Sequence, residues 1–149
     1  MNNINKKIKI LLVDDDEFIQ IFFKDVFWVH DHNKDYEVLV AHDLKEAKKI
    51  IDDSKTKPNI VFLDLVLVKN DVKGQFVFDD NESLKLLKAL KSDTKTKDIV
   101  IVIFSGYSDK SLIKKAMEMG ADEYLVKGEF LPQDLIKITE NILSKTKKS

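Results

Sequence analysis

Residues 7 to 18 read KIKILLVDDDEF, in which an apolar run ends at Val13 and is followed at once by Asp14, Asp15 and Asp16. Two unit charges about 4 Å apart repel each other by roughly 4 kcal/mol at an effective dielectric constant near 20. Three carboxylates at the end of a buried strand therefore need a cation or full contact with water. The stretch predicts a strand, Ile8–Val13, that leads into a charged site.

The length of the chain favours one compact domain. A chain of 149 residues buries about 68–70% of the surface that it exposes when unfolded, which is enough for a core without disulfides or metals. We expect a single domain over residues 1–149, with its core at about 7–144 and a frayed tail at 145–149.

The amino-acid composition limits the classes of molecule that the chain is expected to bind. The 25 basic and 26 acidic residues leave a formal net charge of −1, so the chain lacks the electrostatic footprint of a protein that binds nucleic acid or an anionic membrane. We expect neither partner. The sequence has no cysteine, its first ten residues lack the apolar stretch of a signal peptide, and no apolar run approaches the length of a membrane helix. These features predict a soluble cytoplasmic protein.

Short apolar runs alternate with segments of helical period, a pattern typical of a doubly wound α/β fold with a parallel sheet. The predicted strands are Ile8–Val13, Glu37–Ala41, Ile60–Leu63, Ile99–Phe104 and Glu123–Val126. The third and fourth are apolar enough to be buried on both faces. Apolar stripes that predict five helices are Phe18/Phe22/Val26, Leu44/Ala47/Ile51, Leu84/Leu87/Lys91, Leu112/Ala116/Met119 and Leu135/Ile138/Ile142.

Several residues predict where helices begin and end. Asp16 is expected to cap the first helix and Asp43, with Glu46, the second. Pro132 suits the first turn of the last helix, which is expected to end near Leu143.

The residues that follow the predicted strands form a chemically coherent set. Parallel strands bring their carboxyl ends to one edge of the sheet, where ligands bind in open α/β folds. The residues at that edge would be Asp14, Asp15, His42, Asp64, Ser105 and Lys127. The three carboxylates suit a hard cation such as Mg²⁺. The alternative is a set of ordinary solvated strand ends.

Four motifs at these positions occur in the order and approximate spacing of a known family. LLVDDDE, PNIVFLDL, VIFSG and GADEYLVK together resemble the receiver domain of two-component response regulators. The resemblance covers nearly the whole chain. It implies a CheY-like (flavodoxin-like) fold with strand order 2-1-3-4-5 and five helices.

The resemblance also implies a role for each site residue. Asp64 would accept a phosphoryl group from a histidine kinase or a histidine phosphotransfer protein, with Mg²⁺ as cofactor. The protein would be a stand-alone signalling receiver and not an enzyme in its own right. The implied residues are Asp14, Asp15, Asp64 and the backbone carbonyl of Val66 for the metal, Lys127 and Ser105 for the phosphoryl oxygens, Ser105 and Tyr124 for the switch, and Val66 and Tyr107 for access of water.

The sequence departs from the family at two places. After Asp64, LVLVKNDVKGQFVFDDNESLKLLK lacks the family's proline and delays the next helix, which indicates an insertion at about 68–82. The flanks Val66–Val68 and Phe76–Phe78 are compatible with a small hairpin and also with an irregular loop. Lys127-Gly128 replaces the family's Lys-Pro. A cis bond without proline costs about 2.5–4 kcal/mol. The sequence therefore does not determine whether the bond between Lys127 and Gly128 is cis or trans.

Other readings fit less well. A haloacid-dehalogenase phosphatase would need a second aspartate where Val66 stands, and a nucleotide hydrolase would need a glycine-rich phosphate loop that the chain lacks. His30 and His32, on either side of Asp31, are read as a polar loop in preference to a metal site. The remaining alternative is a pseudo-receiver, a binding module of this architecture that is not phosphorylated.

Overall fold

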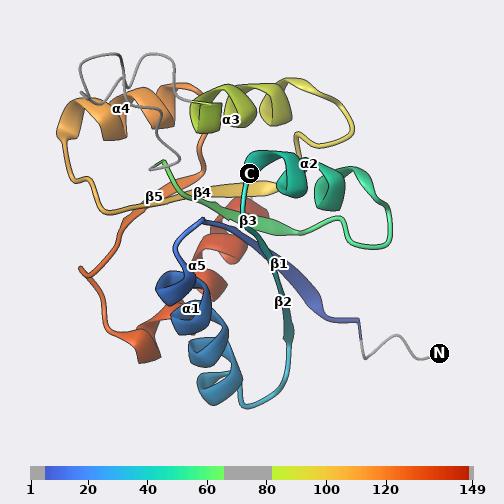
Figure 1. Ribbon diagram of the computed structural model, residues 1–149, viewed down its shortest axis with the longest axis vertical. Coiled ribbons are helices and arrows are strands. Elements are labelled where there is room, and N and C mark those ends of the chain that lie inside the picture. Colours follow the sequence, from blue (N-terminus) through green and yellow to red (C-terminus); the bar gives the residue numbers. More distant parts are fainter. Residues whose placement is uncertain (1–5, 66–81, 148–149) are drawn as a thin grey trace.

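The computed structural model describes residues 6–65 and 82–147. A five-stranded sheet lies at the centre of the molecule (Figure 1). Its strands are β1 (Ile8–Val13), β2 (Tyr36–Ala41), β3 (Ile60–Leu63), β4 (Val100–Ser105) and β5 (Glu123–Val126). All neighbouring pairs are parallel, and the order is β2-β1-β3-β4-β5. The predicted fold class and strand order are confirmed.

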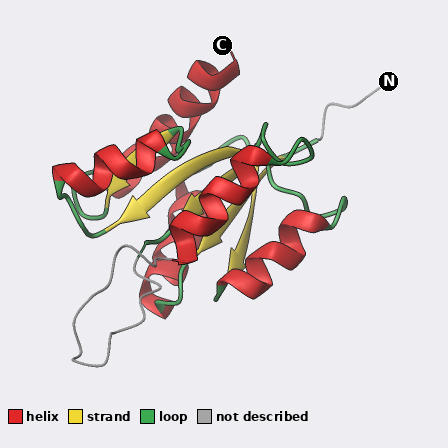
Figure 2. Cartoon of the chain, turned by 90° about the horizontal axis from the view of Figure 1, so that it is seen from above, coloured by secondary structure: helices red, strands yellow, loops and turns green. Residues whose placement is uncertain are grey.

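Helices cover both faces of the sheet, as Figures 1 and 2 show. On one face α1 (Glu17–His30) and α5 (Leu135–Lys147) pack, and on the other lie α2 (Leu44–Asp52), α3 (Glu82–Ser92) and α4 (Lys110–Glu118). A short 3₁₀ helix, η1 (Pro132–Asp134), leads into α5. None of the helices in the described ranges has the length and apolarity needed to cross a membrane.

The central strands are apolar on both sides because both sides are covered. Every residue of β3 and β4 is buried. On the α1 side, the ring of Phe23 lies 5.0 Å from that of Phe62 and 5.9 Å from that of Phe104, both in edge-on arrangements. Such pairs contribute about 0.5–1.5 kcal/mol each beyond the area they bury. These contacts fix the strand ends from which the site is built.

The helix caps follow the sequence prediction. The carboxylate of Asp16 accepts a hydrogen bond from the amide of Phe18 at 2.8 Å, and that of Asp43 accepts one from Glu46 at 2.7 Å. Pro132 stands in the first turn of η1. The last helix, however, does not end near Leu143 but continues to Lys147. Extending a helix that is already formed costs little when the added residues include good helix formers such as lysine.

Three strand boundaries, one in β2 and two in β4, differ from the prediction by one residue. Strand β2 begins at Tyr36 because this residue pairs with Ile8. Strand β4 begins at Val100 because the amide of Ile99 bonds to the carbonyl of Thr96 in the preceding turn. The strand ends at Ser105, which pairs with Val126.

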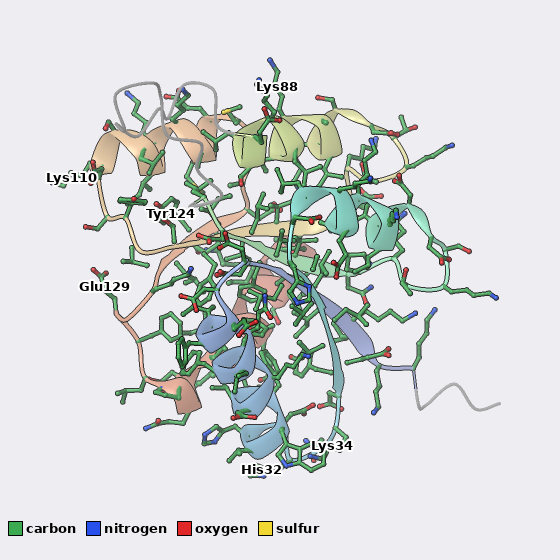
Figure 3. The ribbon with its side chains drawn as sticks, in the orientation of Figure 1. His32, Lys34, Lys88, Lys110, Tyr124 and Glu129 are labelled. Atoms are coloured by element: carbon green, nitrogen blue, oxygen red, sulfur yellow. The ribbon has the colours of Figure 1, made fainter. Side chains whose placement is uncertain are left out.

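The loop after α1, where Figure 3 labels His32 and Lys34, is built around Asp31. The buried Asp31 carboxylate accepts hydrogen bonds from the amides of Asp35 at 3.0 Å and Tyr36 at 2.9 Å. This carboxylate therefore holds the turn into β2. The polar-loop prediction is wrong for His30, which is the last residue of α1, and the loop begins only at Asp31.

The peptide bond between Lys127 and Gly128 is trans, like the other described peptide bonds. Gly128 has a φ angle of 86°, in the left-handed region that glycine enters without strain. The loop after Lys127 therefore turns by means of glycine in the place of the family's proline.

Candidate functional site

The carboxyl ends of four strands bring the predicted site residues to one edge of the sheet. Asp14 and Asp15 follow β1, Asp64 follows β3, Ser105 ends β4 and Lys127 follows β5. Carboxylate oxygens of Asp14, Asp15 and Asp64 lie within 4.8 Å of one another. The structure thus brings together side chains that are far apart in the sequence.

Lys127 provides the positive charge of this cluster. Its ammonium nitrogen lies 2.7 Å from Oδ2 of Asp14 and 3.4 Å from Oδ1 of Asp64. Asp14 has no exposed surface and Asp64 only 1%. Burying a carboxylate is costly unless it is paired and hydrogen-bonded. Lys127, which also lies over the ring of Phe104 at 5.4 Å, compensates for much of this cost.

The two oxygens of the Asp14 carboxylate are both engaged. Oδ2 accepts from Lys127, and Oδ1 accepts from the amide of Asp16 at 3.0 Å. The buried side-chain amide of Gln20 donates to the main-chain carbonyl of Asp14 at 2.7 Å. Asp15, in contrast, is exposed. Asp14 is therefore a fixed part of the site, and Asp15 faces the solvent.

The donor set suits a hard divalent cation. All three side chains offer carboxylate oxygens, two of them come from buried residues, and the third is open to water. A cation of this kind prefers oxygen ligands and keeps several of its waters. The residues present fit such an ion.

Ser105, Tyr107 and Tyr124 form a chain of hydrogen bonds beside the carboxylates. The hydroxyl of the fully buried Ser105 accepts from the amide of Tyr107 at 3.1 Å, and the hydroxyl of Tyr124 donates to the carbonyl of Tyr107 at 2.8 Å. Tyr124, labelled in Figure 3, is 9% exposed and packs with residues of α4 in the core. Burial raises the pKa of its hydroxyl, the Ser105 side chain acts against this shift, and the charge of Asp109 adds to it.

The other predicted positions lie elsewhere. His42 follows β2, is exposed, and its ring lies 3.3 Å from the carboxylate of Glu46 on α2. Val66, predicted for the metal and for water access, lies outside the described residues, as does nearly all of the predicted insertion at 68–82. Glu82, its last predicted residue, begins α3.

Sequence reasoning missed two residues that hold the site in place, Gln20 and Ser83. The hydroxyl of Ser83 donates to the main-chain carbonyl of Asp64 at 2.8 Å. Both are polar residues on the buried face of a helix, Gln20 with Phe23 on α1 and Ser83 with Leu87 on α3. A polar residue within an apolar stripe was the signal that could have indicated them.

Comparisons with known proteins agree with this arrangement. The family model of the response regulator receiver domain matches residues 10–140. The transcriptional regulatory protein CpxR of Escherichia coli K12 is 30% identical over 138 residues, which are 93% of this chain and 50% of CpxR. The probable transcriptional regulator ycf27 of Galdieria sulphuraria is 30% identical over 91% of this chain and 45% of its own length. This chain therefore spans about half the length of these relatives.

Among solved structures, a putative response regulator from Chloroflexus aurantiacus J-10-fl is 28% identical and superposes with a TM-score of 0.71. The match covers 93% of this chain and 99% of that one. The shared part is thus the five-stranded domain described above.

Proposed function

The chain belongs to the response regulator receiver domain family, and we propose that it accepts a phosphoryl group on the carboxylate of Asp64. The observation that carries the proposal is the position of Lys127, whose ammonium reaches both Asp14 and Asp64. A nearly buried carboxylate beside a fixed cation is a suitable acceptor, because the cation stabilises the negative charge that the phosphoryl group brings.

The donor that this site suits is a phosphohistidine of a histidine kinase or of a phosphotransfer protein. In the transfer, a carboxylate oxygen of Asp64 forms a bond to phosphorus while the bond from phosphorus to the imidazole nitrogen breaks. The electron pair of the broken bond stays on the imidazole. The ammonium of Lys127 and the hydroxyl of Ser105 stabilise the phosphoryl oxygens. The protein then acts as a phosphoacceptor and is not a turnover enzyme.

We propose Mg²⁺ as the cation of the carboxylate cluster, with Asp15 and Asp64 as direct ligands and Asp14 mainly through water. The engagement of both Asp14 oxygens with Lys127 and the Asp16 amide supports this division. When bound, Mg²⁺ neutralises negative charge on the phosphoryl oxygens.

The signal is proposed to leave through Tyr107 and Tyr124. A phosphoryl group on Asp64 attracts the Ser105 hydroxyl, which in the present arrangement accepts from the amide of Tyr107. A shift of Ser105 therefore acts on the Tyr107 main chain, to which the Tyr124 hydroxyl is bonded. The surface of β4, α4 and β5 changes as a result. The stand-alone role, the cytoplasmic location and the absence of a nucleic-acid partner stay predictions, since CpxR and ycf27 are longer transcriptional regulators.

The test is intact-mass analysis after incubation with acetyl phosphate and Mg²⁺. We expect wild type to gain the mass of one phosphoryl group, and Asp64→Asn to gain none. Asp16→Asn is the matched control, because it removes a carboxylate from the same edge while asparagine still caps the helix. This control should be modified like wild type.

Two results would contradict the proposal. Wild type that gains no mass, although folded and saturated with Mg²⁺, would favour a pseudo-receiver. Equal modification of Asp64→Asn and wild type would show that the phosphoryl group lies on another residue.

A further inference from the structure

The carbonyl group of the proposed acceptor accepts a hydrogen bond from a helix side chain. Strand β3 ends at Leu63, which is the last residue paired with β4. The Asp64 carbonyl lies beyond that pair, and the hydroxyl of Ser83 donates to it at 2.8 Å. Ser83 has no exposed surface. Removing one partner of a buried hydrogen bond leaves the other polar group unsatisfied, which is unfavourable.

The amide of Asp64 is held as well. It donates to the carbonyl of Val13 at 3.0 Å. The peptide group before the Asp64 Cα is therefore fixed by β1, and the peptide group after it is fixed by α3. With both peptide groups in place, the φ and ψ angles of Asp64 are set, and so is the direction of its Cα–Cβ bond. From this fixed main chain the carboxylate reaches Lys127, whose ammonium nitrogen lies 3.4 Å from Oδ1.

The helix that carries Ser83 is itself well anchored. Leu84, Leu87 and Leu90 of α3 are buried in the core that this face shares with the sheet. Ser83 is the second residue of the helix. Its hydroxyl thus joins α3 to Asp64, although the two residues are 19 positions apart in the sequence. The position of the acceptor is then tied directly to the core.

We infer that Ser83 is a positioning residue for phosphoryl transfer, which acts by holding the peptide group after Asp64. The inference rests on the proposed function. Attack of the Asp64 carboxylate requires an oxygen in line with the bond that breaks, and a misplacement of about 1 Å can lower a rate by about 100-fold. Loss of one of the bonds that hold Asp64 is expected to lower it less, by about tenfold.

The experiment compares wild type with Ser83→Ala, Ser83→Cys and Ser83→Thr. Alanine removes the hydroxyl, cysteine keeps nearly the same volume with a weak donor, and threonine keeps the hydroxyl. The matched control is Thr139→Val, which removes another fully buried hydroxyl that donates to a main-chain carbonyl, that of Leu135 at 2.8 Å. The measurements are the rate of phosphorylation by acetyl phosphate at saturating Mg²⁺ and the melting temperature.

We expect Ser83→Ala and Ser83→Cys to be phosphorylated about tenfold more slowly than wild type, and Ser83→Thr to be within about threefold of it. Thr139→Val should lose melting temperature but keep the wild-type rate. A purely structural role of Ser83 would lower stability in the same way as Thr139→Val without slowing phosphorylation.

The outcomes separate this inference from the proposed function. If wild type is phosphorylated and a folded Ser83→Ala or Ser83→Cys reacts at the same rate, the inference is overturned while the proposed function stands. An equally slow Ser83→Thr would also overturn it, because the hydroxyl would not be the group that matters. If wild type accepts no phosphoryl group, both are overturned.

Discussion

The ammonium nitrogen of Lys127 lies 2.7 Å from Oδ2 of Asp14, although the two residues are 113 positions apart in the sequence. The Asp14 carboxylate has no exposed surface, and the Lys127 side chain is 18% exposed. Lys127 therefore differs from an ordinary surface lysine, whose ion pairs contribute about 0–1 kcal/mol.

From this pair we expect Lys127→Met to destabilise the protein by about 2 kcal/mol when no divalent cation is present, because two buried carboxylates lose their counter-charge. Added Mg²⁺ should raise the stability of this variant more than that of wild type, since the cluster becomes more negative and binds the ion more tightly. Urea unfolding with EDTA and with Mg²⁺ measures both effects. Lys110→Met, at an exposed residue of α4 labelled in Figure 3, is the control. Equal gains from Mg²⁺ in Lys127→Met and wild type would contradict the prediction.

Asp15 and Asp16 are adjacent, yet they should differ in their effect on the metal. Asp15→Asn is expected to weaken Mg²⁺ binding at least tenfold, because a direct carboxylate ligand becomes a neutral amide. Asp16→Asn should stay within about threefold of wild type, since Asp16 caps α1 through the amide of Phe18. The measurement is the rise of melting temperature with Mg²⁺ concentration. Similar weakening in both variants would mean that only the total charge matters.

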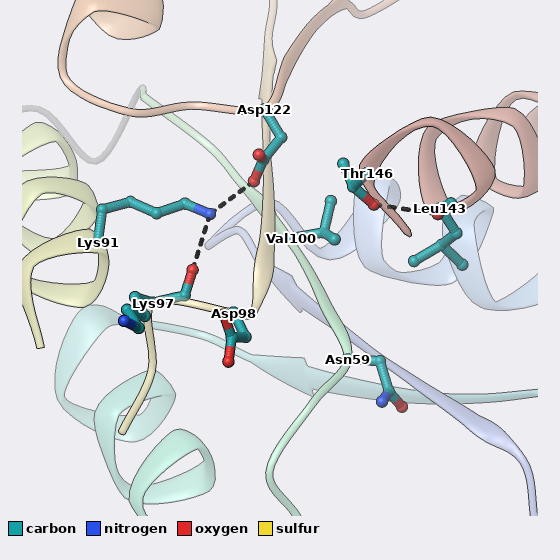
Figure 4. A pocket seen from close by; sticks show the side chains of 8 residues that line it. All are labelled: Asn59, Lys91, Lys97, Asp98, Val100, Asp122, Leu143 and Thr146. Carbon is teal, nitrogen blue, oxygen red and sulfur yellow. Dashed lines mark hydrogen bonds and ion pairs between the residues drawn. The ribbon is translucent and has the colours of Figure 1, made fainter. Parts of the chain in front are cut away.

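At the opposite edge of the sheet, Lys91 of α3 joins the segments that lead into β4 and β5 (Figure 4). Its ammonium donates to Oδ2 of Asp122 at 2.7 Å and to the carbonyl of Ile99 at 2.8 Å. Asp122 also accepts from the amide of Ile101 at 2.8 Å. This group of bonds connects one helix with two strands.

We therefore expect Lys91→Met to lower the free energy of unfolding by about 2 kcal/mol, because hydrogen bonds to charged groups contribute about 1.5–3 kcal/mol. The rate of phosphorylation should not change, since the phosphoryl site lies at the other edge. Lys88→Met, at an exposed lysine of the same helix that Figure 3 labels, should stay within about 0.5 kcal/mol of wild type. Equal stability of Lys91→Met and Lys88→Met would show that these bonds contribute nothing net.

Tyr36 gives the protein a dependence on alkaline pH. Burial raises the pKa of its hydroxyl well above the ordinary value, and the charges of Glu140, Asp31 and Asp35 act in the same direction. In the unfolded chain the group ionises near pH 10. Its contribution to stability is therefore complete below about pH 10 and is lost as pH rises above it, by up to about 1.4 kcal/mol per pH unit.

Thermal unfolding of wild type and Tyr36→Phe between pH 8 and 11 tests this dependence. The variant lacks the ionisable hydroxyl, so its melting temperature should fall less steeply above about pH 10. Lysines lose their charge in the same range in both proteins, and the comparison cancels their effect. Parallel curves would show that Tyr36 does not contribute.

The sequence predicts which residues lie close together at this edge because the strand topology determines it. Once the apolar runs are known to be parallel strands, the residues after them must meet at one edge, and Asp14, Asp64 and Lys127 do meet there. Asp16 lies one residue farther along the chain, which predicts a helix cap, and it does cap α1.

The supporting bonds could not be predicted in the same way. A single serine in an apolar helix does not say which carbonyl it reaches, because that depends on how the helix lies on the sheet; Ser83 reaches Asp64. The helical spacing of the sequence predicts that Lys91 belongs to the apolar stripe of the third helix. Its side chain is in fact 18% exposed and its ammonium bonds to Asp122. The partner lies 31 positions away, and helical period alone does not reveal it.

The last prediction concerns how long a phosphoryl group stays on Asp64. Hydrolysis needs a water in line behind phosphorus, so the groups that cover the site set its rate. Tyr107 is half-buried, and its main chain is fixed by Ser105 and Tyr124. Its side chain has no carboxylate or amide with which to orient a water, so we expect it to exclude water and the phosphoryl group to be comparatively long-lived. Val66, the other predicted position, lies outside the described residues.

Tyr107→Ala should therefore speed the loss of the phosphoryl group by about tenfold, which corresponds to about 1.4 kcal/mol of barrier. Both main-chain hydrogen bonds of residue 107 survive this substitution, so the change reports on the side chain. Tyr107→Phe keeps the ring and should decay like wild type. The measurement is the decay of phosphorylated protein, freed of donor, at matched Mg²⁺ concentration and pH. Equal decay of Tyr107→Ala and wild type would show that the ring does not control access of water. Slower decay of Tyr107→Ala, or of Tyr107→Phe, would mean that the tyrosine assists the attack, because only an assisting group slows hydrolysis when it is removed.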